Sequence, residues 1–503
     1  MKAIFKDIAI LFAGALLPLS LAPFDWWWFA PLPLLAYLWL SQNISYPRRY
    51  WRSFLFGLGY FGSGASWVYV SIHDYGDAPI PLAAALTFLF VAGLALAFSL
   101  PMFLWNRYLQ DKRFGVLLGF PAVWVLNEWY RSWLLTGFPW LYIGYSQTNT
   151  VMGGWAPVTG IYGISFWLAL IAAAVFFAIS TTKKTLLKNS WLPILITLFA
   201  VGSGALLDKK EWTQPVAGAQ QPVALVQGNV PQQQKWKPEQ REAIRSLYRD
   251  LSAPFWQKNQ LIVWPEAAIP ELYTPAHPFF ITMDQQAKNS GGALITGVPS
   301  FHYADDGSHI FYNSLLGLGA ASGFYHKQRL VPFGEYVPMQ QWLQGLLDFF
   351  KMPISDFRTG PANQLNMNSG VMSVASSICY EVTYPELVAA QAKDADILLT
   401  VSNDTWFGSS IGPHQHLQMA QMRARENARE MLRATSNGIS AFIDHKGRII
   451  SRSPQFERFV LQGTAQAYQG HTPYQQMRNQ PVLLVCFFLL LLASRSAVIK
   501  TVS

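Results

Sequence analysis

Long apolar runs separated by short polar turns fill the first two-fifths of the chain, and a different pattern follows them. A helix that crosses a bilayer needs about 20 predominantly apolar residues. Such runs occur at about residues 7–22, 27–41, 53–72, 80–105, 114–130, 156–180, 191–207 and 480–494. The pattern therefore predicts a membrane domain of about seven helices over residues 1–207 and one further helix, with a short tail, over residues 480–503.

Residues 208–479, between the last two runs, are polar and numerous enough to form a full domain. The strand-like segments are "PVALVQGNV", "LIVWPEAAIP", "ALITGVPS", "NSLLGLG", "FYHKQRLVPFGEYVP", "VMSVASSICYE", "DILLTVSND" and "ISAFIDHKGRII". Between them, "PEQREAIRSLYRDLSAPF" and "HQHLQMAQMRARENAREMLRAT" have the periodicity of helices. This alternation predicts a layered α/β domain, in which reactive groups gather where strands end.

Composition and charge agree with a membrane protein whose large polar domain lies outside the cytoplasm. The 503 residues are 51% hydrophobic and only 13% charged, whereas about a quarter is usual in soluble domains. Lys and Arg concentrate at alternate turns, namely Lys2 and Lys6; Arg48, Arg49 and Arg52; Arg107, Lys112 and Arg113; Lys183, Lys184 and Lys188; Arg495 and Lys500. Positive turns stay on the cytoplasmic side, so both termini are expected there and residues 208–479 on the opposite side of the membrane. The net charge of +9 reflects these anchors and does not predict nucleic-acid binding.

Two features of the first helices have competing interpretations. The first 24 residues resemble a cleaved signal peptide, but no A-x-A site follows and further apolar runs come at once, which favours retention. Trp26 to Trp28 are typical of a membrane interface. "GLGYFG" matches G-x-G-x-x-G through Gly57, Gly59 and Gly62, yet it lies inside an apolar run. We interpret it as small residues that let helices approach closely, and not as a dinucleotide site.

Three predicted strand ends bear groups suited to catalysis: Glu266 in "WPEAA", Lys327 in "YHKQR" and Cys379 in "ICYE". A structural reading exists for each, since Cys379 could be a buried small hydrophobe and Lys327 a solvated loop charge. The second cysteine, Cys486, lies in the last apolar run, so a disulfide with Cys379 is not expected. His414 and His416 lack a third ligand nearby, so no metal is predicted.

The order Glu, Lys, Cys in these three motifs resembles the nitrilase superfamily. With the apolar runs before and after the domain, the whole chain is similar to the apolipoprotein N-acyltransferase family of bacterial inner membranes. "QGNVPQQQKW", "TGFPWLYIGYSQ", "LVPFGEYVP" and "VSNDTWFG" strengthen the resemblance. It implies an αββα sandwich in the periplasm, anchored by the helical membrane domain.

The resemblance also implies the reaction and its participants. An acyl chain would pass from a phospholipid, expected to be phosphatidylethanolamine, through a Cys379 thioester to the α-amine of a diacylglyceryl-cysteine apolipoprotein. Glu266 would be the base and Lys327 the oxyanion support. Supporting residues would be Glu335, Tyr380 and Glu381, with Trp236 and Trp406 at the substrate cleft or lid. No cofactor and no nucleic acid are expected, and the chain is expected to act as a monomer.

Two other functions use the same sequence features differently. A membrane-tethered amidase or nitrile hydrolase would share the three reactive residues and pass the acyl group to water. A transporter with a degenerate sensing domain would place ionisable residues at mid-membrane, whereas Glu128 and Arg131 lie near an expected helix end. The combined motifs favour the acyltransferase.

Overall fold

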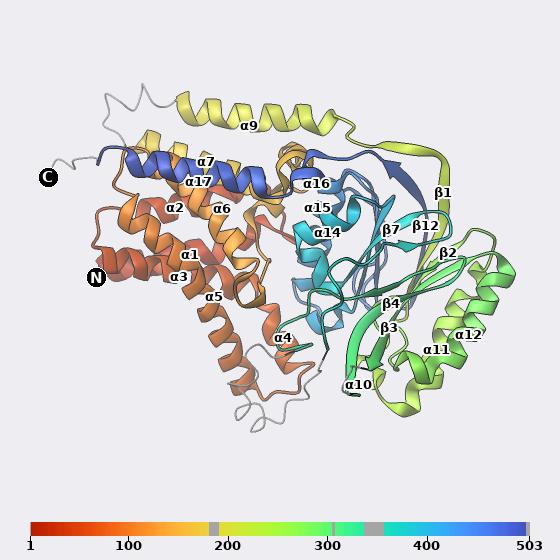
Figure 1. Cartoon of the computed structure of the whole chain (residues 1–503). Helices are drawn as coiled ribbons and strands as arrows, with labels where there is room; N and C mark the ends of the chain where they lie inside the picture. Colours follow the sequence, from red (N-terminus) through yellow and green to blue (C-terminus); the bar gives the residue numbers. More distant parts are fainter. Residues whose placement is uncertain (1, 181–190, 304–306, 337–356, 499–503) are drawn as a thin grey trace. The chain divides into compact units, whose positions relative to one another are not determined.

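The computed structural model describes residues 2–180, 191–303, 307–336 and 357–498 (Figure 1). The chain forms two compact units. Unit 1 contains Met1–Glu211, Phe407–Gln418 and Gln476–Ser503, and unit 2 contains Trp212–Trp406 and Met419–Gln475. The boundaries near residues 211 and 476 lie close to those expected from hydropathy, but the short segment 407–418 belongs to unit 1 although it lies inside the expected soluble domain.

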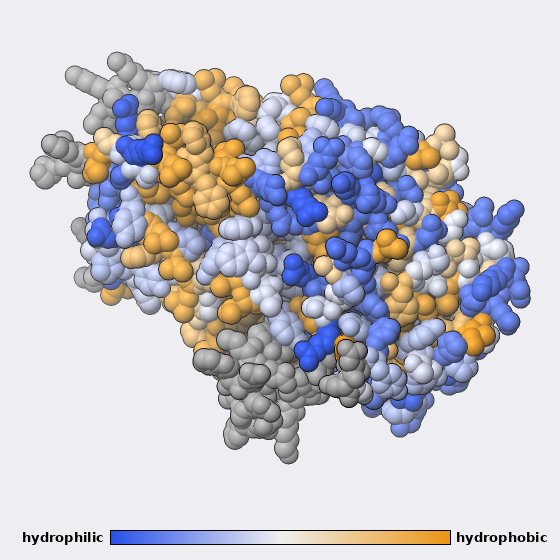
Figure 2. Space-filling view, viewed as in Figure 1, coloured by the Kyte–Doolittle hydropathy of each residue, from blue (hydrophilic) through white to orange (hydrophobic). Residues whose placement is uncertain are grey.

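Unit 1 is built of helices. They are α1 (Lys2–Leu16), α2 (Pro31–Leu40), α3 (Tyr46–Gly64), α4 (Trp67–His73), α5 (Ile80–Tyr108), α6 (Phe120–Arg131), α7 (Ala156–Ile179), α9 (Trp191–Lys209) and α17 (Gln480–Arg495). Among the described residues, four helical segments are long and apolar enough to cross a membrane: Ala3–Ser20, Ile80–Tyr108, Val151–Ile179 and Trp191–Lys209. Many large apolar side chains of this unit are exposed, and patches of them are visible on the face shown in Figure 2.

The other expected spans are shorter or interrupted. Trp27–Leu40 and Gln480–Arg495 are apolar but short, and the run at 53–72 is divided between α3 and α4. The run at 114–130 combines the π-helical turn Gly115–Gly119 with α6. Several apolar helices are therefore present, and the count of eight spans stays a prediction.

The glycines of "GLGYFG" serve helix packing, as the sequence predicted. A β-carbon at Gly59 would lie 2.0 Å from the carbonyl oxygen of Leu11 in α1, so only glycine allows α1 and α3 to come this close. A β-carbon at Gly57 would lie 3.0 Å from the Cα of Ala95 in α5. This run is a packing motif of α3.

Two arginines in the first turns of α3, Arg49 and Arg52, are buried and form ion pairs with aspartates. Arg49 Nη2 lies 2.9 Å from Asp111 Oδ1, and Arg52 Nε lies 2.8 Å from Asp7 Oδ1. A buried charge is tolerated when an opposite charge and hydrogen bonds compensate for lost hydration. These residues thus tie α1, α3 and the end of α5 together, besides any role in setting orientation.

Unit 2 contains two six-stranded mixed sheets. The first has the order β12–β1–β2–β3–β4–β5, with β12 (Phe459–Gln469), β1 (Gln214–Gln227), β2 (Leu261–Val263), β3 (Ala293–Tyr303), β4 (His309–Gly319) and β5 (Phe324–His326). The second has the order β11–β10–β9–β8–β7–β6, with β11 (Ile449–Arg452), β10 (Ala441–Ile443), β9 (Met431–Thr435), β8 (Ile397–Ser402), β7 (Ser373–Ile378) and β6 (Met367–Asn368).

Alternation along the strands creates the layers of unit 2. Leu225 and Val263 of the first sheet share one apolar core with Val374 and Leu399 of the second, so the sheets pack face to face. Side chains on the opposite face of the first sheet pack on α11 (Arg241–Ser252) and α12 (Tyr273–Ser290). Helix α14 (Pro385–Ala392) packs on β7 of the second sheet (Figure 1). The expected αββα arrangement is present.

One expected helix is too long. The segment from His414 to Thr435 was expected to be helical throughout, but α15 spans Gly412–Asn427 and Met431–Thr435 is strand β9. Strand β9 lies between β8 and β10, where its backbone groups complete two ladders. Arg433 is buried in this strand, and its charge is compensated by Asp404, whose Oδ2 lies 2.6 Å from Arg433 Nη2. Tertiary pairing overrides the helical spacing of this stretch.

Candidate active site

Glu266 lies just after β2, as the sequence predicted, and its carboxylate is buried in a set of donors. Oε1 accepts a hydrogen bond from Asn313 Nδ2 at 2.7 Å, and Oε2 accepts one from the backbone N–H of Asn403 at 2.7 Å. Burial acts to raise the pKa of Glu266, but Lys327 and these two donors outweigh burial, so the pKa lies below its usual value. Glu266 is therefore a carboxylate at neutral pH, the form that a base requires.

Lys327 follows β5 and faces two carboxylates. Its Nζ lies 2.8 Å from Glu335 Oε1 and 3.4 Å from Glu266 Oε1, and its side chain is 1% exposed. Burial alone would lower the pKa of Lys327, but Glu335 and Glu266 raise it above its usual value. Lys327 therefore stays a cation, which suits it to support a developing negative charge.

Cys379 is the first residue after β7 and begins the 3-10 turn Cys379–Thr383. Its φ of 54° lies in the left-handed region, which costs a residue with a β-carbon about 1–3 kcal/mol and is frequent at functional sites. Burial and the charge of Glu266 raise the pKa of the thiol, whereas Lys327 lowers it. The thiol is therefore protonated at rest and needs a base, which Glu266 can be.

Glu381 holds the backbone around both Cys379 and Lys327. Its Oε2 accepts the N–H of Ile378 at 2.7 Å, and its Oε1 accepts the N–H of Gln328 at 2.5 Å. The hydroxyl of Tyr325 donates to the same carboxylate at 2.9 Å. Burial raises the pKa of Glu381 to about 7, although these N–H donors favour its charged form. One side chain thus links the residue before Cys379 to the residue after Lys327.

The remaining predicted residues differ in exposure. Tyr380 is buried, and its ring makes an edge contact with Tyr384 at 5.4 Å between centroids. Trp236 is 50% exposed and Trp406 is 41% exposed. Such large exposed rings can contact an acyl chain or a lipid surface.

Sequence reasoning missed Asn313, which joins Glu266 and Glu335. Its Nδ2 lies 2.7 Å from Glu266 Oε1 and 2.9 Å from Glu335 Oε1, so one amide bridges the two carboxylates. The signal in the sequence was an amide in the apolar strand "IFYNSLLG". Lys235, within "QQQKW", was also missed, although its Nζ lies 3.3 Å from the carbonyl oxygen of Glu266.

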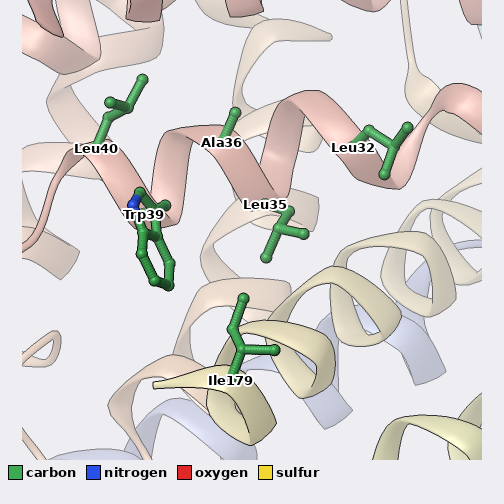
Figure 3. A pocket seen from close by; sticks show the side chains of 6 residues that line it. All are labelled: Leu32, Leu35, Ala36, Trp39, Leu40 and Ile179. Carbon is green, nitrogen blue, oxygen red and sulfur yellow. The ribbon is translucent and has the colours of Figure 1, made fainter.

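A separate groove lies on the surface of unit 1 and has a different character. It is lined by Leu32, Leu35, Ala36, Trp39 and Leu40 of α2 and by Ile179 of α7, with a volume of ≈ 440 Å³ (Figure 3). Leu35 and Ile179 point toward one another across it. Its lining contains no nucleophile, acid or base, so the groove has no means of acyl transfer.

Comparison with known proteins places both parts of the chain. Residues 13–174 match the family model described as the apolipoprotein N-acyltransferase N-terminal domain, and residues 222–474 match the carbon-nitrogen hydrolase model. The chain is 46% identical to the apolipoprotein N-acyltransferase of Azotobacter vinelandii over 488 residues, which covers 96% of this chain and 94% of that protein. The chain belongs to the apolipoprotein N-acyltransferase family.

A second relative of the same name gives the same result. The enzyme of that name from Pseudomonas aeruginosa (strain PAO1) is 47% identical over 489 residues, which covers 96% of this chain and 94% of that protein. Among solved structures, a carbon-nitrogen hydrolase from Helicobacter pylori is 14% identical with a TM-score of 0.36 and covers 53% of this chain and 94% of its own. An amidase variant from Nesterenkonia sp. AN1 is 17% identical with a TM-score of 0.35 and covers 54% and 97%. The family model and the two named relatives confirm the family expectation from the sequence.

Proposed function

We propose that this protein transfers a fatty acyl chain from a membrane phospholipid to the α-amino group of the N-terminal S-diacylglyceryl-cysteine of apolipoproteins. The observation that supports this most directly is the meeting of three strand ends, which brings Glu266 and Lys327 to 3.4 Å and places Cys379 within the electrostatic reach of both. The membership in the acyltransferase family agrees with this chemistry. Phosphatidylethanolamine is the donor that we expect, and a monomer is the expected working unit.

The first half-reaction loads the enzyme. Glu266 accepts the thiol proton of Cys379, and the thiolate attacks the ester carbonyl carbon of the phospholipid. The Lys327 ammonium stabilises the oxyanion of the tetrahedral intermediate. The carbon–oxygen bond to glycerol then breaks, the alkoxide takes the proton from Glu266, and lysophospholipid leaves a Cys379 thioester behind.

The second half-reaction unloads the enzyme. Glu266 accepts a proton from the α-amine of the apolipoprotein as the nitrogen attacks the thioester carbonyl carbon. The intermediate expels the Cys379 thiolate, which recovers its proton from Glu266, and an amide is formed. Lys327 supports the oxyanion in both halves, and Glu335 and Asn313 hold the charges in place.

The localisation belongs to this proposal as well. We place the protein in the bacterial inner membrane, with both termini cytoplasmic and the catalytic domain periplasmic, because Lys and Arg alternate between the turns. Thiols engineered at Asp77 and Gln220 should be labelled by a membrane-impermeant reagent in intact spheroplasts, whereas a thiol at Lys112 should not. Labelling of a thiol at Lys112 would contradict the proposed orientation. A thiol at Asn189 should also stay unlabelled, and this position lies outside the described residues.

Mass spectrometry tests the chemistry. Protein incubated with phospholipid and no acceptor should gain one acyl chain on Cys379 and release one lysophospholipid per active site. Addition of a diacylglyceryl peptide should clear the adduct and give the N-acylated peptide. A membrane-tethered amidase is the alternative, and it would lose the adduct to water without any acceptor. No observation favours that alternative over transfer.

A further inference from the structure

A second lysine lies beside the proposed base. Lys235 is the last residue of helix α10 (Gln232–Lys235), and it is 3% exposed although Trp236, the next residue, is half exposed. Lysine is almost never buried to this degree without a partner, because its ammonium group loses its hydration. A lysine buried to this degree therefore needs a compensating partner.

The contact of Lys235 is with the backbone of Glu266. Its Nζ donates to the carbonyl oxygen of Glu266 at 3.3 Å. The next residue, Ala267, has a φ of 45°, in the left-handed region, so the chain turns sharply just after the base. Burial lowers the pKa of Lys235 to about 8, and the carboxylate of Glu266 acts against this change. The ammonium group thus lies within electrostatic reach of the Glu266 side chain and holds the strained peptide that bears it.

The charges of Glu266, Glu335 and Lys327 are balanced when Lys235 is counted with them. Lys327 contacts both Glu266 and Glu335, so these three residues alone leave one buried negative charge in excess. Asp404, whose charge also raises the pKa of Cys379, is already paired with Arg433 at 2.6 Å.

The fourth acid near the site has its own donors. Glu381 accepts the N–H groups of Ile378 and Gln328 and the hydroxyl of Tyr325. With Lys235, the two negative charges of Glu266 and Glu335 are matched by the two positive charges of Lys235 and Lys327.

We propose that Lys235 is a positioning residue for acyl transfer, which fixes the peptide unit of Glu266 and balances the second negative charge of the site. The proposal rests on the proposed function, since it assumes that Glu266 takes the thiol proton. Moving that proton from Cys379 to Glu266 shifts a negative charge between the two residues without changing the total. Lys235 stabilises the carboxylate form of Glu266, which is the form that can accept the thiol proton. Without Lys235 this carboxylate would be less well compensated, and it would take up a proton from solvent at a higher pH.

The test compares three variants of the full-length protein in detergent: Lys235→Met, Lys235→Arg and Lys237→Met. Lys237 is an exposed lysine two residues away and provides the matched control. The rate of Cys379 acyl-adduct formation is measured in single turnover between about pH 3 and 8.5, so that the acid limb of the wild-type protein is included. A fluorescent phospholipid is the donor. Thermal unfolding of each variant is measured in parallel.

Loss of the Lys235 charge should act in a pH-dependent way. An opposite charge nearby lowers a carboxyl pKa by about 1–3 units, so its removal should raise the pKa of Glu266. The acid limb of the rate profile should move upward by about one pH unit in Lys235→Met, so acylation should be about tenfold slower on the acid limb and change little at neutral pH. Lys235→Arg should keep the acid limb of the wild-type protein, because it keeps the charge, and Lys237→Met should match the wild type throughout.

Three outcomes would overturn the proposal while leaving the proposed function intact. In the first, the rate profile of Lys235→Met equals that of the wild-type protein. In the second, Lys235→Met forms the adduct more slowly by the same factor at every pH. In the third, the acid limb of Lys235→Arg moves as far as that of Lys235→Met. If Lys235→Met does not fold, Lys235→Arg still tests the proposal. An effect of the positive charge requires the acid limb of Lys235→Arg to coincide with that of the wild-type protein. Absence of a Cys379 adduct in the wild-type protein would instead refute the proposed function itself.

Discussion

The substitution Glu335→Gln isolates one charge of the site without changing the size of the side chain. Glu335 Oε1 lies 2.8 Å from Lys327 Nζ and 2.9 Å from Asn313 Nδ2, while Oε2 accepts the N–H of Val331 at 2.8 Å. Glutamine keeps one oxygen for these donors but lacks the charge. Lys327 would then have Glu266, 3.4 Å away, as its only carboxylate among the described residues.

The size of the effect follows from burial and distance. The Lys327 side chain is 1% exposed and the Glu335 side chain 12%, so solvent screens this pair weakly. Breaking a buried ion pair costs about 3–5 kcal/mol, and a hydrogen bond to a charged group contributes about 1.5–3 kcal/mol. Because glutamine retains the hydrogen-bonding oxygen, we expect a loss of about 2–3 kcal/mol in the free energy of unfolding.

The catalytic effect should exceed the effect on stability. Lys327 would move toward Glu266 and away from the oxyanion, and loss of one electrostatic donor typically slows an acyl transfer by about 10²–10³-fold. Glu335 is the charge that raises the pKa of Lys327 most. Its removal lowers that pKa, so the variant should lose activity as the pH rises through a range in which the wild-type protein keeps it.

The assay measures formation of the Cys379 acyl adduct in single turnover as a function of pH, together with thermal unfolding. Glu386→Gln, an exposed acid at the start of α14, is the matched control and should resemble the wild-type protein. If Glu335→Gln acylates within about threefold of the wild type over the whole pH range, the reasoning is wrong. Lys327 would then need no second carboxylate to act.

The remaining predictions concern the three catalytic candidates and a control cysteine. Cys379→Ala should form no acyl adduct, and Cys379→Ser should fail nearly as badly because a hydroxyl is a far weaker nucleophile than a thiolate at neutral pH, whereas Cys486→Ala should stay within a few-fold of the wild type by mass spectrometry. Robust acylation by the serine variant would mean that the base contributes more than the thiol does. Glu266→Gln should block adduct formation by removing the base, and Lys327→Ala should slow it by about 10²–10³-fold. Normal acylation by both variants, with failure only after the acceptor is added, would confine these residues to the second half-reaction.

Much of the fold followed from local patterns in the sequence. Apolar runs of bilayer length predicted the helices α1, α5, α7 and α9, because a helix must satisfy its backbone within the segment and expose about 20 apolar side chains to lipid. Strand β9 could not be predicted in this way. Its residues have the spacing of a helix, and they form a strand because β8 and β10 offer hydrogen bonds on both sides.

The candidate site divides in the same manner. Glu266, Lys327 and Cys379 were predicted because each follows a strand-like run, and the order of the three resembles one superfamily. Asn313 and Lys235 could not be identified, since an amide in a strand and a lysine in a polar stretch have ordinary structural explanations. Their importance depends on which oxygens they contact, and residues far apart in the chain provide those oxygens.

The sequence by itself determined which groups of this protein are available for chemistry and which segments are apolar enough for a membrane. Both properties depend on residue types and on spacing over a few turns, so they can be read without coordinates. Only the tertiary structure decided the charge balance of the site, with Glu266 between Lys327 and Asn313 and with Lys235 behind its peptide. Electrostatic interactions fall off with distance and depend on burial, and neither quantity is defined until distant strands are packed together.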